Sequence, residues 1–295
     1  MQYKELYDRL VRSLEIPGMN IPTAFVRLYK HADSVPGQVL EYNVEEETVT
    51  SCQAIRHATH GHPVYLTQEN SGCIAAAISL GLVDKNQTEP LPRPRLYTEL
   101  MKTQSNLGNG FKPPSPAQFS SGEVYACKEQ GKPSFCLFGA EDSGRFKNIE
   151  TARKAINSMA AIQPPEMQGV FFFGPDYSRE PVVPHVVVMA VRPVELTRII
   201  QGYQFLTGDP INAVLSPLRA MDSDLIARPY LTGKINVSSL CLGARLVAGF
   251  EGDRMGLGVP WKSFEKLVKG MEASRTGFPF SRYPGAKPFH DAPKK

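Results

Sequence analysis

Two unbroken apolar runs of strand length constrain this fold more than any other feature of the sequence. They cover residues 169–173 and 185–191. Apolar and polar residues do not alternate in them, as they would in a strand with one solvent-exposed face. Such runs are typical of strands that are covered on both faces. Residues 193–203 follow with apolar side chains on one helical stripe. The sequence therefore predicts a sheet that is flanked by helices.

Frequent prolines and glycines, 25 and 24 in 295 residues, limit the length of each element and disfavour long helical bundles. Apolar periodicity and turn signals predict α/β (or α+β) architecture with a mixed sheet and proline-rich loops. The expected helices are 3–14, 52–59, 73–80, 96–105, 151–162, 193–207 and 260–271. The expected strands are 23–30, 64–66, a hairpin of 123–127 and 134–138, then 169–173, 185–191, 211–215, 235–237 and 254–259.

The chain is expected to form one α/β domain over residues 1–272, with a subdomain seam best placed near 106–118, where proline and glycine cluster. Residues 273–295 form a tail that is rich in proline, aromatic and basic residues. Its aromatic side chains favour docking on a neighbouring subunit and hence a homo-oligomer, and disorder is the alternative.

The formal charge of +4 comes in good part from the tail, so nothing in the body calls for nucleic acid. No apolar run approaches the roughly 18 residues of a membrane span, and the charged N-terminus does not resemble a secretory signal. Five cysteines at scattered spacing fit reduced thiols better than a disulfide framework. We therefore expect a cytoplasmic protein with no membrane partner.

Three of those cysteines carry the best chemical clue. Cys52 and Cys73 each stand where a helix is predicted to begin, which favours the thiolate, and Cys241 lies in a Leu-Cys-Leu-Gly-Ala-Arg stretch. One hypothesis is that the three thiolates hold an iron–sulfur cluster. The alternatives are packing cysteines in a metal-free module that binds a small molecule or cofactor, and a thiol enzyme with Cys73 or Cys52 as nucleophile and a histidine as base. Cys127 and Cys136, on the predicted hairpin, are not assigned as ligands.

Two further candidates lie close to the cysteines in sequence. His57, His60 and His62 follow Cys52 with the spacing of a zinc or other transition-metal site, although exposed imidazoles at a helix end would look the same. Arg245 is a candidate catalytic residue, because a guanidinium next to a cluster or substrate can anchor an anion, and a surface ion pair is the alternative. Nucleotide-binding glycine motifs are absent from the sequence.

An ordered set of short motifs resembles the family numbered 169 among domains of unknown function, the uncharacterised ArCR proteins. The resemblance runs from about residue 20 to 272. The motifs are Cys52-Gln-Ala-Ile-Arg56, Gly61, Ser71-Gly72-Cys73, Leu80-Gly81-Leu82, a strand followed by Leu196-Thr-Arg-Ile-Ile-Gln-Gly-Tyr203, Cys241-Leu-Gly-Ala-Arg245 and Gly258-Val-Pro260.

The resemblance implies an archaeal or anaerobic bacterial setting, which favours the iron–sulfur hypothesis. It also implies a further cysteine in the region matching residues 218–224, where this chain has Arg-Ala-Met-Asp-Ser over 219–223. That departure favours a three-cysteine site whose fourth ligand is open or unusual. We therefore expect a [4Fe–4S] cluster on Cys52, Cys73 and Cys241, in a sulfur- or electron-handling protein with a small-molecule, sulfur or redox partner.

Overall fold

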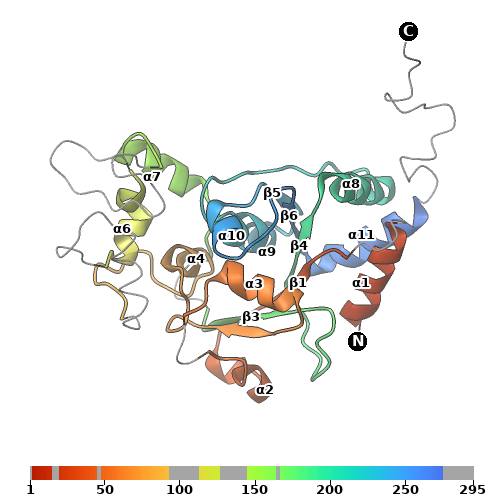
Figure 1. The fold of residues 1–295 in the computed structure, drawn as a ribbon, viewed down its shortest axis with the longest axis horizontal. Coiled ribbons are helices and arrows are strands. Elements are labelled where there is room, and N and C mark those ends of the chain that lie inside the picture. The colour runs from red at the N-terminus through yellow and green to blue at the C-terminus, as the bar shows by residue number, and fades with distance from the viewer. Residues whose placement is uncertain are drawn as a thin grey trace, which may run out of the picture.

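The computed structural model describes residues 2–14, 20–44, 48–92, 113–126, 145–163 and 167–274. Its strands form one six-stranded sheet in the order β2-β3-β1-β4-β6-β5 (Figure 1). The strands are β1 (Thr23–Tyr29), β2 (Val64–Leu66), β3 (Gly169–Phe173), β4 (Val186–Val191), β5 (Asn236–Ser238) and β6 (Met255–Pro260). Among the described residues every ladder is antiparallel, and parallel pairing is found there only at isolated bridges. The predicted sheet with flanking helices is confirmed, and antiparallel ladders take the place of a mixed sheet.

Four short α-helices, at residues 37–40, 116–121, 228–232 and 242–246, were not predicted, whereas six others overlap a predicted helix, so the described residues hold ten in all. They are α1 (Gln2–Ser13), α2 (Gly37–Leu40), α3 (Ser51–Thr59), α4 (Ile74–Ser79), α6 (Pro116–Ser121), α7 (Ile149–Ser158), α8 (Pro193–Thr207), α9 (Arg228–Thr232), α10 (Leu242–Leu246) and α11 (Trp261–Ala273). Short 3-10 turns are η1 (Ala32–Ser34) and η3 (Glu123–Tyr125), and η4 (Ala220–Ala227) is π-helical. Pro193 opens α8 at its first turn, and Gly208, with φ 69°, ends it, as proline and glycine at these positions favour.

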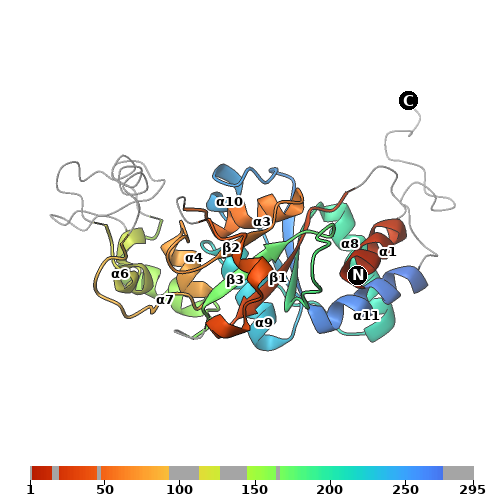
Figure 2. The ribbon, with the colours of Figure 1, turned by 90° about the horizontal axis from the view of Figure 1, so that it is seen from below.

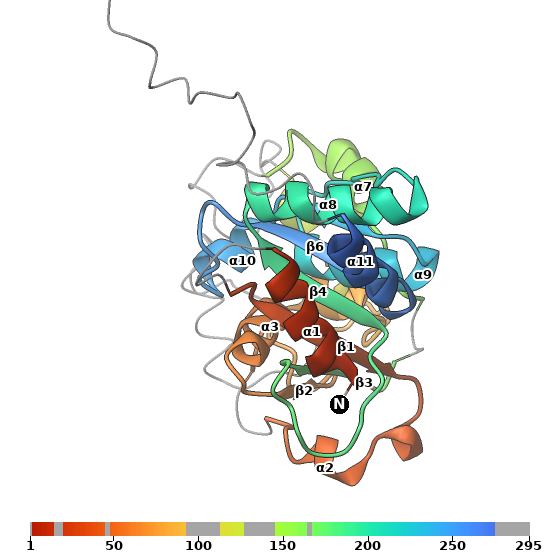
Figure 3. The same cartoon turned by 90° about the vertical axis from the view of Figure 1, so that its right-hand side faces the viewer.

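The central strands are buried on both faces because their side chains alternate between two cores. Phe25 of β1 and Phe173 of β3 face a core that α1, α8 and α11 cover. Val26 and Phe172 face the opposite core, against α3, α4 and η4. Figures 2 and 3 show α1, α8 and α11 grouped on one side of the sheet. The cysteines of interest all belong to the second core, so the sheet separates them from α1, α8 and α11.

Two predicted strands are wrong. Glu123–Tyr125 forms the 3-10 turn η3 after Gly122, whose φ of 87° ends α6. Residues 211–215 have no regular structure, because Val214 exchanges hydrogen bonds with the side chain of Asn236 and not with a neighbouring strand. The predicted helix 96–105, the hairpin strand 134–138 and the tail from 275 lie outside the described residues.

In the described part of the chain, no helix combines the length and apolar character needed to cross a membrane.

His185, just before β4, gives the fold a testable pH dependence. Its Nδ1 accepts the Leu28 N–H at 3.1 Å, and burial, aided by the charges of Arg27 and Lys30, lowers the pKa of His185 to about 4. The unfolded imidazole takes up its proton near pH 6.5, so the folded state loses stability as the pH falls from about 6.5 to 4. Because the ring is partly exposed, we expect protonation of His185 to lower the free energy of unfolding by about 1 kcal/mol between pH 7 and pH 5.

The measurement is urea denaturation at pH 7 and pH 5 for the wild type and for His185→Asn. An asparagine oxygen can still accept the Leu28 N–H but cannot take up a proton, so the variant should lose less stability on acidification. The same substitution at the exposed His62 is the control. Equal acid sensitivity of His185→Asn and the wild type would contradict this account of the histidine.

Candidate functional site

The three predicted cysteines come together on one face of the sheet. Cys52 lies in the first turn of α3, Cys73 is the N-cap residue of α4, and Cys241 is the N-cap residue of α10. The Cys52 thiol donates a hydrogen bond to the Cys241 sulfur, and the charge on Cys241 also acts on Cys73. Figure 1 shows α3, α4 and α10 beside one another. Three segments that are far apart in the sequence therefore point their helix N-termini at one cluster of thiols.

Local interactions shape the chain where α3 and α10 begin. Thr50 caps α3, and the Gln53 side chain accepts the Thr50 N–H in return, which forms a capping box. Before Cys241, Leu240 has the uncommon positive φ of 62°, and its N–H donates to the Ser238 hydroxyl. This turn carries the chain from the end of β5 directly into the cysteine cluster.

The Cys241 sulfur is the centre of the cluster. It accepts backbone N–H hydrogen bonds from Ala244 in its own helix and from Ala220 and Met221 at the start of η4. The Cys52 thiol and these N–H groups lower the pKa of Cys241, although its burial acts in the opposite direction. These contacts therefore favour the thiolate at Cys241 without any added cation.

Helix N-termini do not produce thiolates at the other two positions. Donation of its proton to Cys241, together with burial, raises the pKa of Cys52 well above its ordinary range. Burial raises the pKa of Cys73 to about 11, and the Ala76 N–H offsets only part of that effect. The expectation of thiolates at Cys52 and Cys73 is thus wrong for the metal-free protein, because desolvation outweighs the helix N-terminus.

Asp222 of η4 is a member of this site that sequence reasoning missed. Its side chain is 2% exposed, and its charge acts on both Cys52 and Cys73. Burial raises the pKa of Asp222 to about 7, although the nearby Ser51 hydroxyl favours the carboxylate. The approach of Ser51 falls short of a regular hydrogen bond, so Asp222 Oδ1 and Ser51 Oγ are unsatisfied among the described residues. A buried carboxylate oxygen without a partner is costly unless something else binds it.

Arg219, which precedes η4, is the second residue that the sequence did not reveal. It has a left-handed backbone with φ 53°, which is rare for an arginine and is found mainly where the surroundings enforce it. Its Nη2 donates to the Phe119 carbonyl oxygen at 2.9 Å. Its positive charge favours the ionised forms of Cys73 and Asp222. A buried guanidinium therefore balances negative charge in the cysteine cluster.

The other sequence candidates lie outside this cluster. His57, His60 and His62 are exposed at the far end of α3 from Cys52, and His60 contacts the Arg56 carbonyl oxygen. Arg245 donates to the carbonyl oxygens of residues 239, 251 and 254 at 2.7–3.1 Å, so its guanidinium braces the loop around α10. Among the residues that the structure describes, no three His, Cys, Asp or Glu side chains are arranged to hold a single metal ion.

Comparison with known proteins adds a family but no activity. A family profile described as domain of unknown function 169, uncharacterised ArCR, matches residues 21–270. An uncharacterized protein of Methanocaldococcus jannaschii is 20% identical over 276 residues, which cover 93% of this chain and 97% of that protein. No solved structure matches the chain.

Proposed function

The chain belongs to the domain of unknown function 169 family, the uncharacterised ArCR proteins, and from its site we propose that Cys52, Cys73 and Cys241 hold an iron–sulfur cluster. The single observation that carries this proposal is the convergence of three cysteines from three separate helix N-termini. Packing alone gives no reason for one buried and two partly buried cysteines to coincide with so many backbone N–H donors.

The donor set fits a cluster better than it fits a single ion. Thiolates are the usual ligands of iron–sulfur clusters, and N–H groups that point at the sulfurs stabilise the negative charge of the ligated state. Cys241 receives three such N–H groups, and Cys73 receives one from Ala76. A single metal ion would need all its ligands around one point, whereas a cluster takes each thiolate on a different iron.

Asp222 is the candidate non-cysteine ligand of the cluster, and its surroundings support the same proposal. Its unsatisfied Oδ1 is buried beside the thiols, and a carboxylate is an anionic oxygen donor. Arg219 lies on the same side and offsets part of the added negative charge. When bound, the cluster would supply electron transfer and an iron that is held less firmly than the cysteine-bound ones. The residues of this chain would bind it, orient it and exclude bulk water from most of its surface.

Replacing the carboxylate with a thiol tests the role of Asp222. In anaerobically purified protein, we expect Asp222→Cys to slow the release of iron to a chelator by about tenfold, and Asp222→Ala to speed it. Cysteine tolerates complete burial, so the fold should accept the change. The measurement is the time course of iron release, together with the iron-to-sulfide ratio before and after brief exposure to air.

Ser223→Cys provides a matched control, because it adds a thiol at the next residue of the same buried segment. It should release iron at the wild-type rate. Identical release from the wild type, Asp222→Ala and Asp222→Cys would exclude Asp222 as a ligand while leaving the three cysteines in place.

Thiol chemistry is the second candidate, and one specific contact favours it. The Cys52 thiol lies against the Cys241 sulfur, which is the arrangement of a nucleophilic cysteine next to a second thiol that can resolve it. This alternative predicts colourless protein in which an alkylating reagent modifies Cys241 first. A metal-free binding module predicts colourless protein with no selective alkylation.

A further inference from the structure

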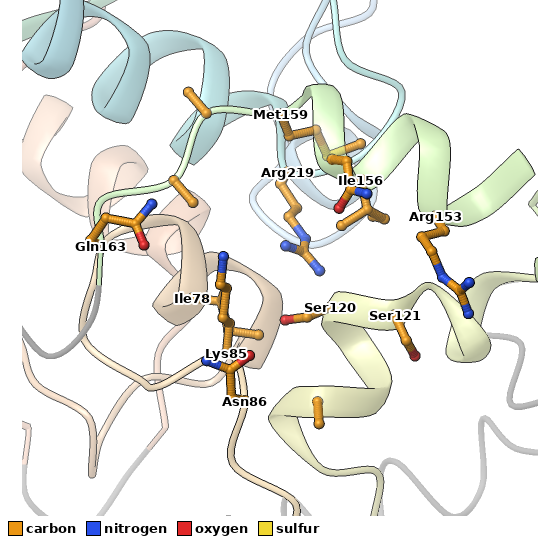
Figure 4. Close-up of a pocket in the computed structure, with 14 residues that line it drawn as sticks. Ile78, Lys85, Asn86, Ser120, Ser121, Arg153, Ile156, Met159, Gln163 and Arg219 are labelled. Carbon is orange, nitrogen blue, oxygen red and sulfur yellow. The ribbon is translucent and has the colours of Figure 1, made fainter. Parts of the chain in front are cut away.

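A cavity of about 520 Å³ lies between α4, α6, α7 and the start of η4 (Figure 4). Arg219, whose charge also acts on Cys73, lines it, and so does Lys85 from the loop after α4. Arg153 of α7 lies farther out, on the side of Ser121 (Figure 4). Four separate segments thus contribute to one hollow.

The charge of this cavity has one sign. The described residues that line it include three cations, Lys85, Arg153 and Arg219, and no acidic side chain. In the described part of the chain, neither Lys85 nor Arg153 forms an ion pair. Lys85 and Arg153 therefore add a positive potential around the hollow, which attracts anions.

Two buried polar atoms in the cavity also lack partners. Arg219 is only 7% exposed, yet its Nε has no hydrogen-bond partner among the described residues, and neither has the buried Ser120 Oγ. Figure 4 shows the Arg219 guanidinium and the Ser120 hydroxyl pointing toward one another, with the Lys85 amine reaching in from another side. Buried donors of this kind are costly unless a ligand or water binds them.

We propose that this cavity binds a small organic oxyanion, in which a phosphate, sulfonate or carboxylate group is joined to an apolar body. Arg219, Ser120 and Lys85 would hold the oxyanion, because guanidinium and ammonium groups form strong charge-assisted hydrogen bonds with it. Ile78, Ile156 and Met159 line the same cavity and suit an apolar group. This site does not depend on a cluster, although Arg219 would place the anion next to Cys73 and Asp222.

Isothermal titration calorimetry at constant ionic strength tests the proposal with phenyl phosphate, phenylsulfonate, benzoate and inorganic phosphate. We expect at least one of the three aromatic anions to bind more tightly than inorganic phosphate, and the order among them identifies the preferred oxyanion. Lys85→Ala and Ser120→Ala should each weaken that binding, the former by about tenfold. Both positions are only partly buried, so the variants should fold.

Lys154→Ala is the matched control, because Lys154 is an exposed cation on α7 next to Arg153 but does not line the cavity. It should bind as the wild type does. Absence of measurable binding, or equal weakening by Lys154→Ala and Lys85→Ala, would overturn the proposal. Cys241→Ser should keep its anion affinity whether or not it contains iron. Failure of the cluster proposal would therefore appear in the iron content, and failure of the anion proposal would appear in the calorimetric affinity.

Discussion

Cys241→Ser should leave protein purified without oxygen with at least about tenfold less iron and sulfide than the wild type. The Cys241 sulfur accepts the Cys52 thiol and the N–H groups of Ala244, Ala220 and Met221, so it is where α3, α10 and η4 meet. A serine oxygen can keep those hydrogen bonds and preserve the fold, but it is a poor substitute for a thiolate on iron. The measurement is iron and acid-labile sulfide per chain, with the visible spectrum.

The remaining two cysteines supply the control for this experiment. Cys127 and Cys136 lie outside the described residues, and the sequence predicts that neither is a ligand. Cys127→Ser and Cys136→Ser should therefore retain their iron, whereas Cys52→Ser and Cys73→Ser should lose it as Cys241→Ser does. Full iron content in Cys241→Ser, or an equal loss in Cys136→Ser, would contradict the assignment of the three ligands.

Gly258→Ala should destabilise the fold by about 3 kcal/mol or more. Gly258 lies in β6 directly beneath η4, and a Cβ added there would lie 2.3 Å from the Leu225 carbonyl oxygen and 2.7 Å from the Leu225 Cα. Both of these are backbone atoms, so the clash cannot be relieved by turning a side chain. Because η4 also carries Asp222, we expect the displaced backbone to weaken iron retention as well.

Gly252→Ala is the matched control for that substitution. Gly252 has no atom within 4 Å of an added Cβ and does not have a positive φ, so its replacement should change the free energy of unfolding by less than about 0.5 kcal/mol. Thermal or urea denaturation compares the two variants with the wild type. Wild-type stability in Gly258→Ala would show that η4 does not pack on β6 as described.

The sequence predicted most of the fold because its main elements follow simple periodic rules. The amphipathic stripes of α1, α8 and α11 and the apolar runs of β3 and β4 place their residues in the two cores as expected. The three cysteines were singled out from the sequence because Cys52 and Cys73 stand at predicted helix starts and Cys241 lies in a Leu-Cys-Leu-Gly-Ala-Arg stretch. Their spatial convergence depends on the strand order, which periodicity does not specify.

The part of the site that the sequence did not reveal lies in η4. A π-helix lacks the 3.6-residue apolar period, and Arg219 takes a left-handed conformation that propensity assigns to glycine or asparagine. The useful signal was chemical: Asp222, Ser223 and Asp224 stand between the apolar pairs Ala220-Met221 and Leu225-Ile226. Acidic residues in such a stretch are buried only with partners, as Asp224 is with Ser216.

The most direct test of the central claim is the iron and acid-labile sulfide content of the wild-type protein, purified without oxygen and examined by visible spectroscopy. Iron and sulfide in near-equal, stoichiometric amounts per chain, in brown protein, are the predicted result. Colourless protein with neither iron nor sulfide, after anaerobic purification and an attempt at reconstitution with both, would contradict the cluster and leave thiol chemistry at Cys241 as the better account.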